Sequence, residues 1–135
     1  MSYCALNRLV RPLNKKTPMA FLDVLLPIVT DQFEDTVTFY QQISGEKVKV
    51  SAAHDGYYLK LVGSFVILGA DDPVALKIPR QVQAIFLVKD LDFYWQQVQS
   101  FLSEVIVPLS VVSTGRRFII RQQDGKVVEY LELFN

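Results

Sequence analysis

The same order of sequence landmarks occurs twice in this chain of 135 residues, and this repeat restricts the possible folds more than any other feature. The apolar run ending in "IVTD" at Asp31 is followed by "FYQQ", and the run ending in "LVKD" at Asp90 is followed by "FYWQQ". Glycines suited to turns then follow in both halves, at positions 56 and 63 and at positions 115 and 125. A module of about 60 residues repeated in tandem is a strong signal, because one module alone would leave a sheet face uncovered.

The first module, about residues 20–70, predicts a strand, a helix and three more strands. The apolar run 20–29 has the length of a strand. Asp31, with Glu34 three residues later, is typical of a helix N-cap, and Gly45 predicts the end of that helix. Three strands are expected in "KVKVSAA", "GYYLKLV" and "SFVILGA", with "HDG" as the turn between the first two.

The second module, about residues 82–134, predicts the same order after a polar, proline-containing link at 71–80. The strand "QVQAIFLV" precedes a helix capped by Asp90, and "EVIVPLSVV" is a strand bent or ended by Pro108. "GRRFIIRQ" and "GKVVEYLELF" complete the module. We therefore expect an α+β fold of tandem βαβββ modules in a single domain of residues 19–135, preceded by an N-terminal arm at 1–18.

Composition excludes several classes of partner. Half of the residues are hydrophobic, enough for a substantial core, and 14 basic residues balance 14 acidic ones. A neutral chain without a basic stripe argues against nucleic acid as the main partner. Cys4 is the only cysteine, and there is no uninterrupted apolar run of roughly 18 residues. We expect a soluble, cytoplasmic protein that does not bind membranes.

The segments "FLVKDLDFYWQQV" and "GRRFIIRQQDGKVVEYLEL", together with "IVTDQFEDTVTFYQQISGEKV" in the first half, resemble the vicinal oxygen chelate superfamily. That group includes glyoxalase I, bleomycin-resistance proteins, extradiol dioxygenases and methylmalonyl-CoA epimerases. The resemblance covers roughly residues 20–134. It implies a curved, mostly antiparallel eight-stranded sheet around a cavity, often completed in a homodimer.

The resemblance places a cavity-facing carboxylate at Glu129, where the family carries a metal-binding glutamate. Strand alternation supports this, because Val127, Glu129 and Leu131 share one face while Lys126 and Glu132 mark the other as partly wet. The alternative is a solvated edge carboxylate. On the first strand of the second module, the family's ligand position falls on Gln83, a weak metal ligand but an adequate hydrogen-bond partner for a substrate.

The first half departs from the family's metal-binding pattern. The positions that match Gln83 and Glu129 there are Val24 and Ile67, neither of which binds metal. A catalytic divalent site usually needs three protein ligands. The sole histidine, His54, lies in the expected "HDG" turn and is interpreted as a surface residue. We therefore expect no metal and no cofactor, which puts enzymatic activity in doubt.

The sequence thus favours a metal-free protein that binds a small, partly apolar molecule. Two successive tyrosines, at 57 and 58, and two successive arginines, at 116 and 117, each present one member to the cavity. The residues assigned to the ligand site are Glu129, Gln83, Leu26, Ile85, Leu87, Tyr58 and Arg116. Further aliphatic residues expected on the cavity face are Val24, Ile28, Ile67 and Leu131. The alternatives are a metal-dependent lyase, isomerase or transferase of the same superfamily, and a protein-interaction module that has lost the site.

Overall fold

The computed structural model describes residues 21–134, and within them the order βαβββ occurs twice. The elements of the first module are β1 (Asp23–Val29), α2 (Phe33–Ser44), β2 (Val48–His54), β3 (Tyr57–Val62) and β4 (Phe65–Ala70). The link holds two short 3-10 helices, η1 (Pro73–Leu76) and η2 (Pro79–Gln81). The second module consists of β5 (Ala84–Leu87), α3 (Leu91–Val98), β6 (Leu102–Val112), β7 (Gly115–Gln122) and β8 (Val127–Leu133). The predicted arm at 1–18 lies outside the described residues.

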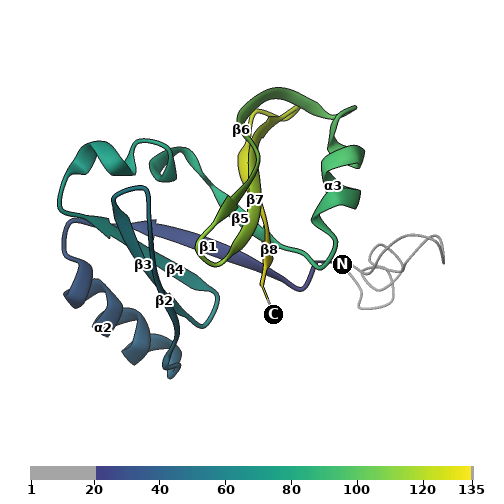
Figure 1. Cartoon of the computed structure of the whole chain (residues 1–135). Coiled ribbons are helices and arrows are strands. Elements are labelled where there is room, and N and C mark those ends of the chain that lie inside the picture. Colours follow the sequence, from purple (N-terminus) through teal and green to yellow (C-terminus); the bar gives the residue numbers. More distant parts are fainter. Residues whose placement is uncertain (1–20, 135) are drawn as a thin grey trace.

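All eight strands belong to one curved sheet in the order β2-β3-β4-β1-β5-β8-β7-β6. β1 pairs with β4 in parallel, β5 pairs with β8 in parallel, and the other neighbours are antiparallel. The two modules join where β1 runs antiparallel to β5, with Leu25 opposite Ile85. The helices lie outside the sheet, α2 against β3 and β4, and α3 against β7 and β8 (Figure 1). The predicted fold class is confirmed.

Successive side chains along the strands point alternately into a helix-facing core and into an inner core. Val37, Val62 and Ile67 form the core beneath α2. The core beneath α3 contains Val88, Leu91, Val98, Phe118, Ile120, Val128 and Tyr130. The opposite faces of both modules contribute to one shared inner cluster, which includes Leu25, Tyr57, Val66, Leu68, Ile85 and Ile119. The inner face is therefore the place where the two modules meet.

Two of the three predicted helix ends are confirmed. The side chain of Asp90 accepts a hydrogen bond from the backbone N–H of Phe93, and Gly45 ends α2 in the left-handed conformation with φ 71°. The prediction for Asp31 is wrong, because α2 begins after Gln32. The hydroxyl of Thr30 lies 2.9 Å from the Gln32 backbone nitrogen, whose N–H it accepts, so this threonine stabilises the entry to the helix in place of an aspartate cap.

Strand lengths differ from prediction in the second module. β6 continues through Pro108 and is not ended by it. The pairing of β6 with β7 shifts register between Val107 and Ser110, which accommodates the proline. β6 is also an edge strand, where a missing backbone donor is tolerated.

Candidate ligand-binding site

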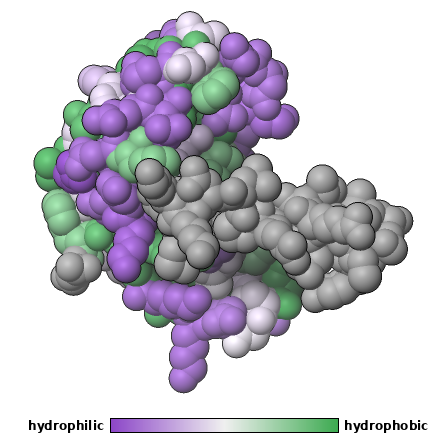
Figure 2. All heavy atoms as spheres, turned by 90° about the vertical axis from the view of Figure 1, so that its right-hand side faces the viewer, coloured by the Kyte–Doolittle hydropathy of each residue, from purple (hydrophilic) through white to green (hydrophobic). Residues whose placement is uncertain are grey.

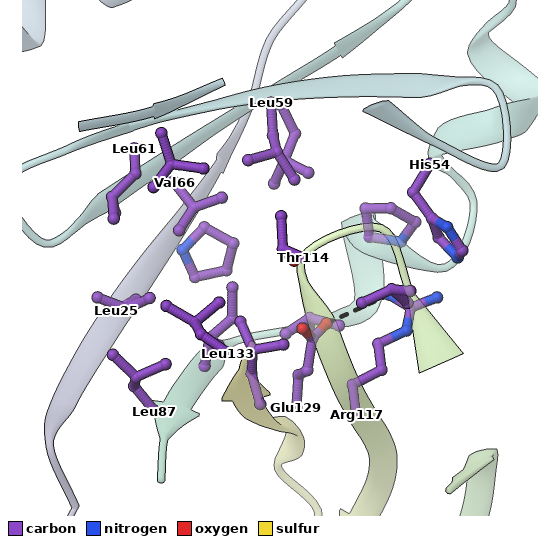
Figure 3. A pocket seen from close by; sticks show the side chains of 18 of the residues that line it. Leu25, His54, Leu59, Leu61, Val66, Leu87, Thr114, Arg117, Glu129 and Leu133 are labelled. Atoms are coloured by element: carbon purple, nitrogen blue, oxygen red, sulfur yellow. Dashed lines mark hydrogen bonds and ion pairs between the residues drawn. The ribbon is translucent and has the colours of Figure 1, made fainter. Parts of the chain in front are cut away.

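A pocket opens between the inner faces of the two modules. Its apolar wall includes Leu25, Leu59, Leu61, Val66, Leu68 and Ile85. Its polar residues are His54, Tyr57, Ser113, Thr114, Arg117 and Glu129. Figure 3 shows Leu25, Leu61 and Val66 on one side, and His54 and Arg117 on the other, with Glu129 reaching toward Arg117. The site thus has an apolar body and one polar end.

The pocket has room for a small molecule. The cavity volume accessible to the centre of a water molecule is about 80 Å³. A single water needs only about 10–15 Å³ on this measure. An aliphatic wall with few polar groups is the usual composition of a small-molecule site.

The polar end is a cluster of three side chains from both modules. Arg117 Nη1 donates to the hydroxyl of Tyr57 at 3.0 Å and to Glu129 Oε1 at 3.4 Å. The side chains of Arg117 and Glu129 are only 9% and 13% exposed, so this ion pair is largely removed from water. Strand pairing brings it about: Arg117 lies opposite Leu131 in the β7–β8 ladder, and Leu131 shares a face with Glu129. Tyr57 reaches the pair from β3 in the other module.

Burial changes the protonation chemistry of the cluster. Burial of Glu129 raises the pKa of its carboxyl above the usual value. The positive charge of Arg117 opposes this shift only in part. Burial also raises the pKa of the Tyr57 hydroxyl, again against the effect of Arg117. Tyr57 therefore remains a protonated hydroxyl at neutral pH, and Glu129 accepts a proton more readily than an exposed glutamate.

The guanidinium of Arg117 is incompletely paired. Its Nε is buried and has no hydrogen-bond partner among residues 21–134. A buried N–H donor without an acceptor is costly, so an unpaired donor in a pocket deserves a functional explanation.

His54 stands beside this cluster, contrary to the expectation of a surface turn residue. It is the last residue of β2, and the turn consists of Asp55 and Gly56, with φ 49° and 84°. The His54 side chain is 21% exposed, and its Nε2 lies 2.9 Å from Asp55 Oδ2. Because a two-residue turn places His54 directly opposite Tyr57, both side chains line the pocket.

The structure brings only part of the sequence-based site together. Glu129, Ile85 and Leu87 line the pocket, as does Leu131. Gln83, Leu26, Tyr58 and Arg116 do not lie on the pocket wall.

The face assignment of β1 is wrong by one residue. Leu25 and Pro27 line the pocket, whereas Val24 and Leu26 point outward and are 52% and 46% exposed. β1 is apolar at nearly every position, so alternation of hydrophobic and polar residues could not reveal which face points inward.

The same correction applies to two residues beneath α2. Ile28 and Ile67 belong to the helix-facing core. Residues next to them in sequence line the pocket instead; on β4 these are Val66 and Leu68. Strands buried on both faces carry no polar positions that would separate the two sides.

Tyr58 and Arg116 also point away from the pocket. Tyr58 packs edge-on against Phe33 of α2, with ring centroids 4.7 Å apart. Arg116 contacts Asp92 and Glu132 on the α3 side. Tyr57 and Arg117 are the members of the two pairs that face inward.

Gln83 is exposed and bonds to the backbone instead of facing the pocket. Its side-chain oxygen accepts from the N–H of Val127 at 3.0 Å, while its own backbone N–H donates to the Val127 carbonyl. β5 begins only at Ala84, so regular alternation does not extend back to Gln83. Val82 lines the pocket there.

Hairpin register is the signal that could have selected Arg117. Arg121 pairs with Val127 across a loop of odd length, residues 122–126, so odd-numbered residues of β7 face odd-numbered residues of β8. Arg117 therefore shares the face of Glu129. No comparable signal identifies Ser113 and Thr114, which reach the pocket from the β6–β7 turn.

The pocket does not suit a divalent metal ion. Within residues 21–134 there is no group of three or more histidine, cysteine, aspartate or glutamate residues positioned to hold a metal ion. Glu129, which the resemblance predicts at a ligand position, is instead paired with a guanidinium. A metal bound to Glu129 would lie close to the positive charge of Arg117, which disfavours it.

The structure has two βαβββ modules around a shared pocket, the fold predicted from the resemblance to the vicinal oxygen chelate superfamily. No protein-family model and no curated protein matches the chain. Similar solved structures include an uncharacterized protein from Methanosarcina mazei, with 28% identity, TM-score 0.76, and coverage of 86% of this chain and 95% of that one.

Two further similar structures connect the fold to characterised groups. The methylmalonyl-CoA epimerase of Mycobacterium tuberculosis is 14% identical, with TM-score 0.63 and coverage of 90% and 95%. A glyoxalase/bleomycin resistance protein/dioxygenase superfamily member from Vibrio splendidus 12B01 is 17% identical, with TM-score 0.53 and coverage of 82% and 97%. These similarities establish the fold.

Among residues 21–134, no helix has both the length and the apolar character needed to cross a membrane.

Proposed function

We propose that this protein binds a small, largely apolar molecule in the inner pocket without the help of a metal ion. The observation that carries the proposal is the pocket itself, an aliphatic wall with a single buried charged cluster at one end. Apolar walls supply affinity through burial, and a few fixed polar groups supply orientation.

The ion pair supports independence from metal. Glu129 already has a cationic partner in Arg117, with 3.4 Å between Nη1 and Oε1. A guanidinium is not deprotonated in proteins, so it stays as a permanent positive charge beside the carboxylate. Metal binding at Glu129 would require the Arg117 side chain to move away and further metal-ligating side chains to approach.

A metal-dependent epimerase, lyase or transferase is the alternative that the fold suggests, since similar structures include methylmalonyl-CoA epimerases. The residues at this pocket do not supply the ligand set that such a site requires. We therefore assign it to the binding class, and we derive no catalytic step.

The first test is metal analysis of the purified protein. We expect no stoichiometric divalent metal. Tight binding of about one zinc, nickel, manganese or iron ion per chain, lost on Glu129→Ala, would contradict the proposal.

The second test measures binding in the pocket. Leu61→Phe places a larger side chain on the aliphatic wall and should narrow the pocket. Binding of six-carbon probes such as hexanamide should weaken by roughly tenfold, equivalent to about 1.4 kcal/mol. Val111→Phe introduces the same side chain on an exposed part of β6, where Val111 is 66% exposed, and should leave binding unchanged. Equal affinity of both variants would place the binding site elsewhere.

A further inference from the structure

We infer that the pocket selects a ligand by a neutral carbonyl group, whose oxygen accepts hydrogen bonds from Arg117, and not by a cation that pairs with Glu129. This inference rests on the proposed binding function and specifies the head group that the polar end recognises. It reverses the simplest expectation for a buried glutamate, which is a cationic ligand.

The first step concerns the charge of the cluster. Arg117 and Glu129 form a buried pair whose charges cancel. A cationic ligand would approach an already paired carboxylate and would also meet the guanidinium beside it. A carboxylate ligand would face Glu129 in the same way. Bringing a full charge of either sign into a neutral, buried site has a desolvation cost much larger than that of a neutral head group.

The second step concerns the donors that remain. Arg117 uses Nη1 for both of its contacts, to Tyr57 and to Glu129. Nε has no partner, and Nη2 makes no hydrogen bond to a described residue. The N–H groups of Nε and Nη2 point from the same edge of the planar guanidinium, the edge that receives oxygen acceptors in paired hydrogen bonds. Because Nε is buried, we expect the ligand oxygen to meet Nη2 first.

The third step adds a further donor and an acceptor. Tyr57 accepts from Arg117 and makes no other hydrogen bond to a described residue, so its hydroxyl hydrogen is available. Burial raises the pKa of this hydroxyl, which keeps it protonated. Glu129 Oε2 has no hydrogen-bond partner among the described residues and can accept an N–H. A primary amide offers both an oxygen for the donors and an N–H for this acceptor.

The experiment compares three probes with matched six-carbon chains: hexanamide, hexanoate and hexylammonium. Affinities are measured by calorimetry or ligand-observed NMR at neutral pH. We expect hexanamide to bind the wild-type chain at least about tenfold tighter than hexylammonium, the effect of one hydrogen bond to a charged group. The Nε–H resonance of Arg117, identified by its loss in an Arg117 variant, should shift with hexanamide.

Two variants separate charge from shape. Glu129→Gln leaves the charge of Arg117 uncompensated, so hexanoate should gain at least about tenfold and become the tightest probe. The double variant Arg117→Met, Glu129→Gln removes both charges and should abolish the preference among head groups. Arg116→Met changes the same residue type on the same strand but on the opposite face, and should alter nothing.

The outcomes separate the inference from the proposed function. Tightest wild-type binding of hexylammonium or hexanoate would overturn the inference and leave pocket binding intact. A head-group preference that persists in the double variant would also overturn it. Failure of all three probes to bind at millimolar concentration would contradict the proposed function itself, and the inference with it.

Discussion

Two adjacent arginines on β7 point to opposite faces of the sheet and have different environments. Arg117 points inward to a largely buried pair with Glu129 and to the hydroxyl of Tyr57. Arg116 points outward, where its side chain is 30% exposed and bonds to Asp92 and Glu132. Hydrophilic residues predominate on the α3 side of the molecule (Figure 2). The two arginines are therefore neighbours in sequence and different in environment.

The outer cluster has a structural explanation. Glu132 Oε1 accepts the backbone N–H of Leu91 at 3.0 Å, while its Oε2 receives Arg116 Nη2 at 3.1 Å. Leu91 is the first residue of α3, so this carboxylate ties β8 to an otherwise unpaired donor at the start of the helix. Both carboxylate oxygens of Glu132 therefore have a partner within the outer cluster.

The inner cluster differs, because its polar atoms are only partly paired among the described residues. Burial raises the pKa of the Glu129 carboxyl, and the buried Nε of Arg117 has no partner in the described part of the chain. A buried ion pair is weak evidence of a stabilising role, because desolvation offsets much of the attraction. The outer charges thus hold the helix, whereas the incomplete pairing of the inner charges is consistent with the proposed ligand site.

The largest effect should follow removal of the inner arginine. Arg117→Met leaves Glu129 charged, buried and unpaired, and should lower the free energy of unfolding at neutral pH by about 3–5 kcal/mol. Urea denaturation provides the measurement. Addition of Glu129→Gln to this variant removes the uncompensated charge and should restore much of the loss. Additive effects of the two substitutions would show that the pair is not coupled.

A smaller effect is expected from the outer glutamate. Glu132→Ala removes the acceptor for the Leu91 N–H and should lower the free energy of unfolding by about 1–2 kcal/mol, without changing hexanamide affinity. Glu132→Gln keeps an oxygen for Leu91 and should cost less than about 1 kcal/mol, since the ion pair with Arg116 is partly exposed. Loss of probe binding in either variant would assign the outer cluster to the binding site.

The sequence predicted the modules well because their signals are local and repeated. Asp90 marks the start of α3 through its side-chain cap, Gly45 marks the end of α2 through its left-handed backbone, and turns mark the strands. The family resemblance predicted the inward position of Glu129, and the alternation of side chains along β8 supported it.

The rest of the site depended on information that is not local. The apolar pattern of β1 does not show that Leu25 lines the pocket in place of Leu26, and the choice between Arg116 and Arg117 requires the pairing register of β7 with β8. Gln83 lies just before β5, where a side chain can turn back to the backbone. Tyr57 could be selected over Tyr58 only through the position of α2, against which Tyr58 packs.

The pH dependence of stability provides a finer test of the inner face. The pKa of Glu129 is raised on folding, so the native state binds more protons than the unfolded state in the pH range between the ordinary glutamate value and the raised one. The contribution of this group is therefore greatest below the ordinary value and is lost as pH rises through the raised pKa.

Glu129→Gln should remove this dependence. It should leave the fold intact and abolish a slope of at most about 1.4 kcal/mol per pH unit in that window. Thermal unfolding of both proteins between acidic and neutral pH measures the difference. Parallel pH profiles would mean that Glu129 is not desolvated in solution.

The smallest effect on the isolated chain is expected at β1, where the outer face has little cover. Leu26 is 46% exposed and Val24 is 52% exposed, in contrast to Ile67, which is fully buried beneath α2. Leu26→Gln should change the free energy of unfolding of a monomer by less than about 0.5 kcal/mol, because an exposed side chain gains little from folding.

We expect this outer face of β1 to be covered in a homodimer, since adjoining exposed apolar residues favour association. Light scattering of the wild-type chain should then give twice the chain mass of 15.4 kDa at micromolar concentration, and Leu26→Gln should shift the equilibrium toward monomer. A wild-type protein that remains monomeric under these conditions would show that β1 tolerates its exposed leucine without a partner.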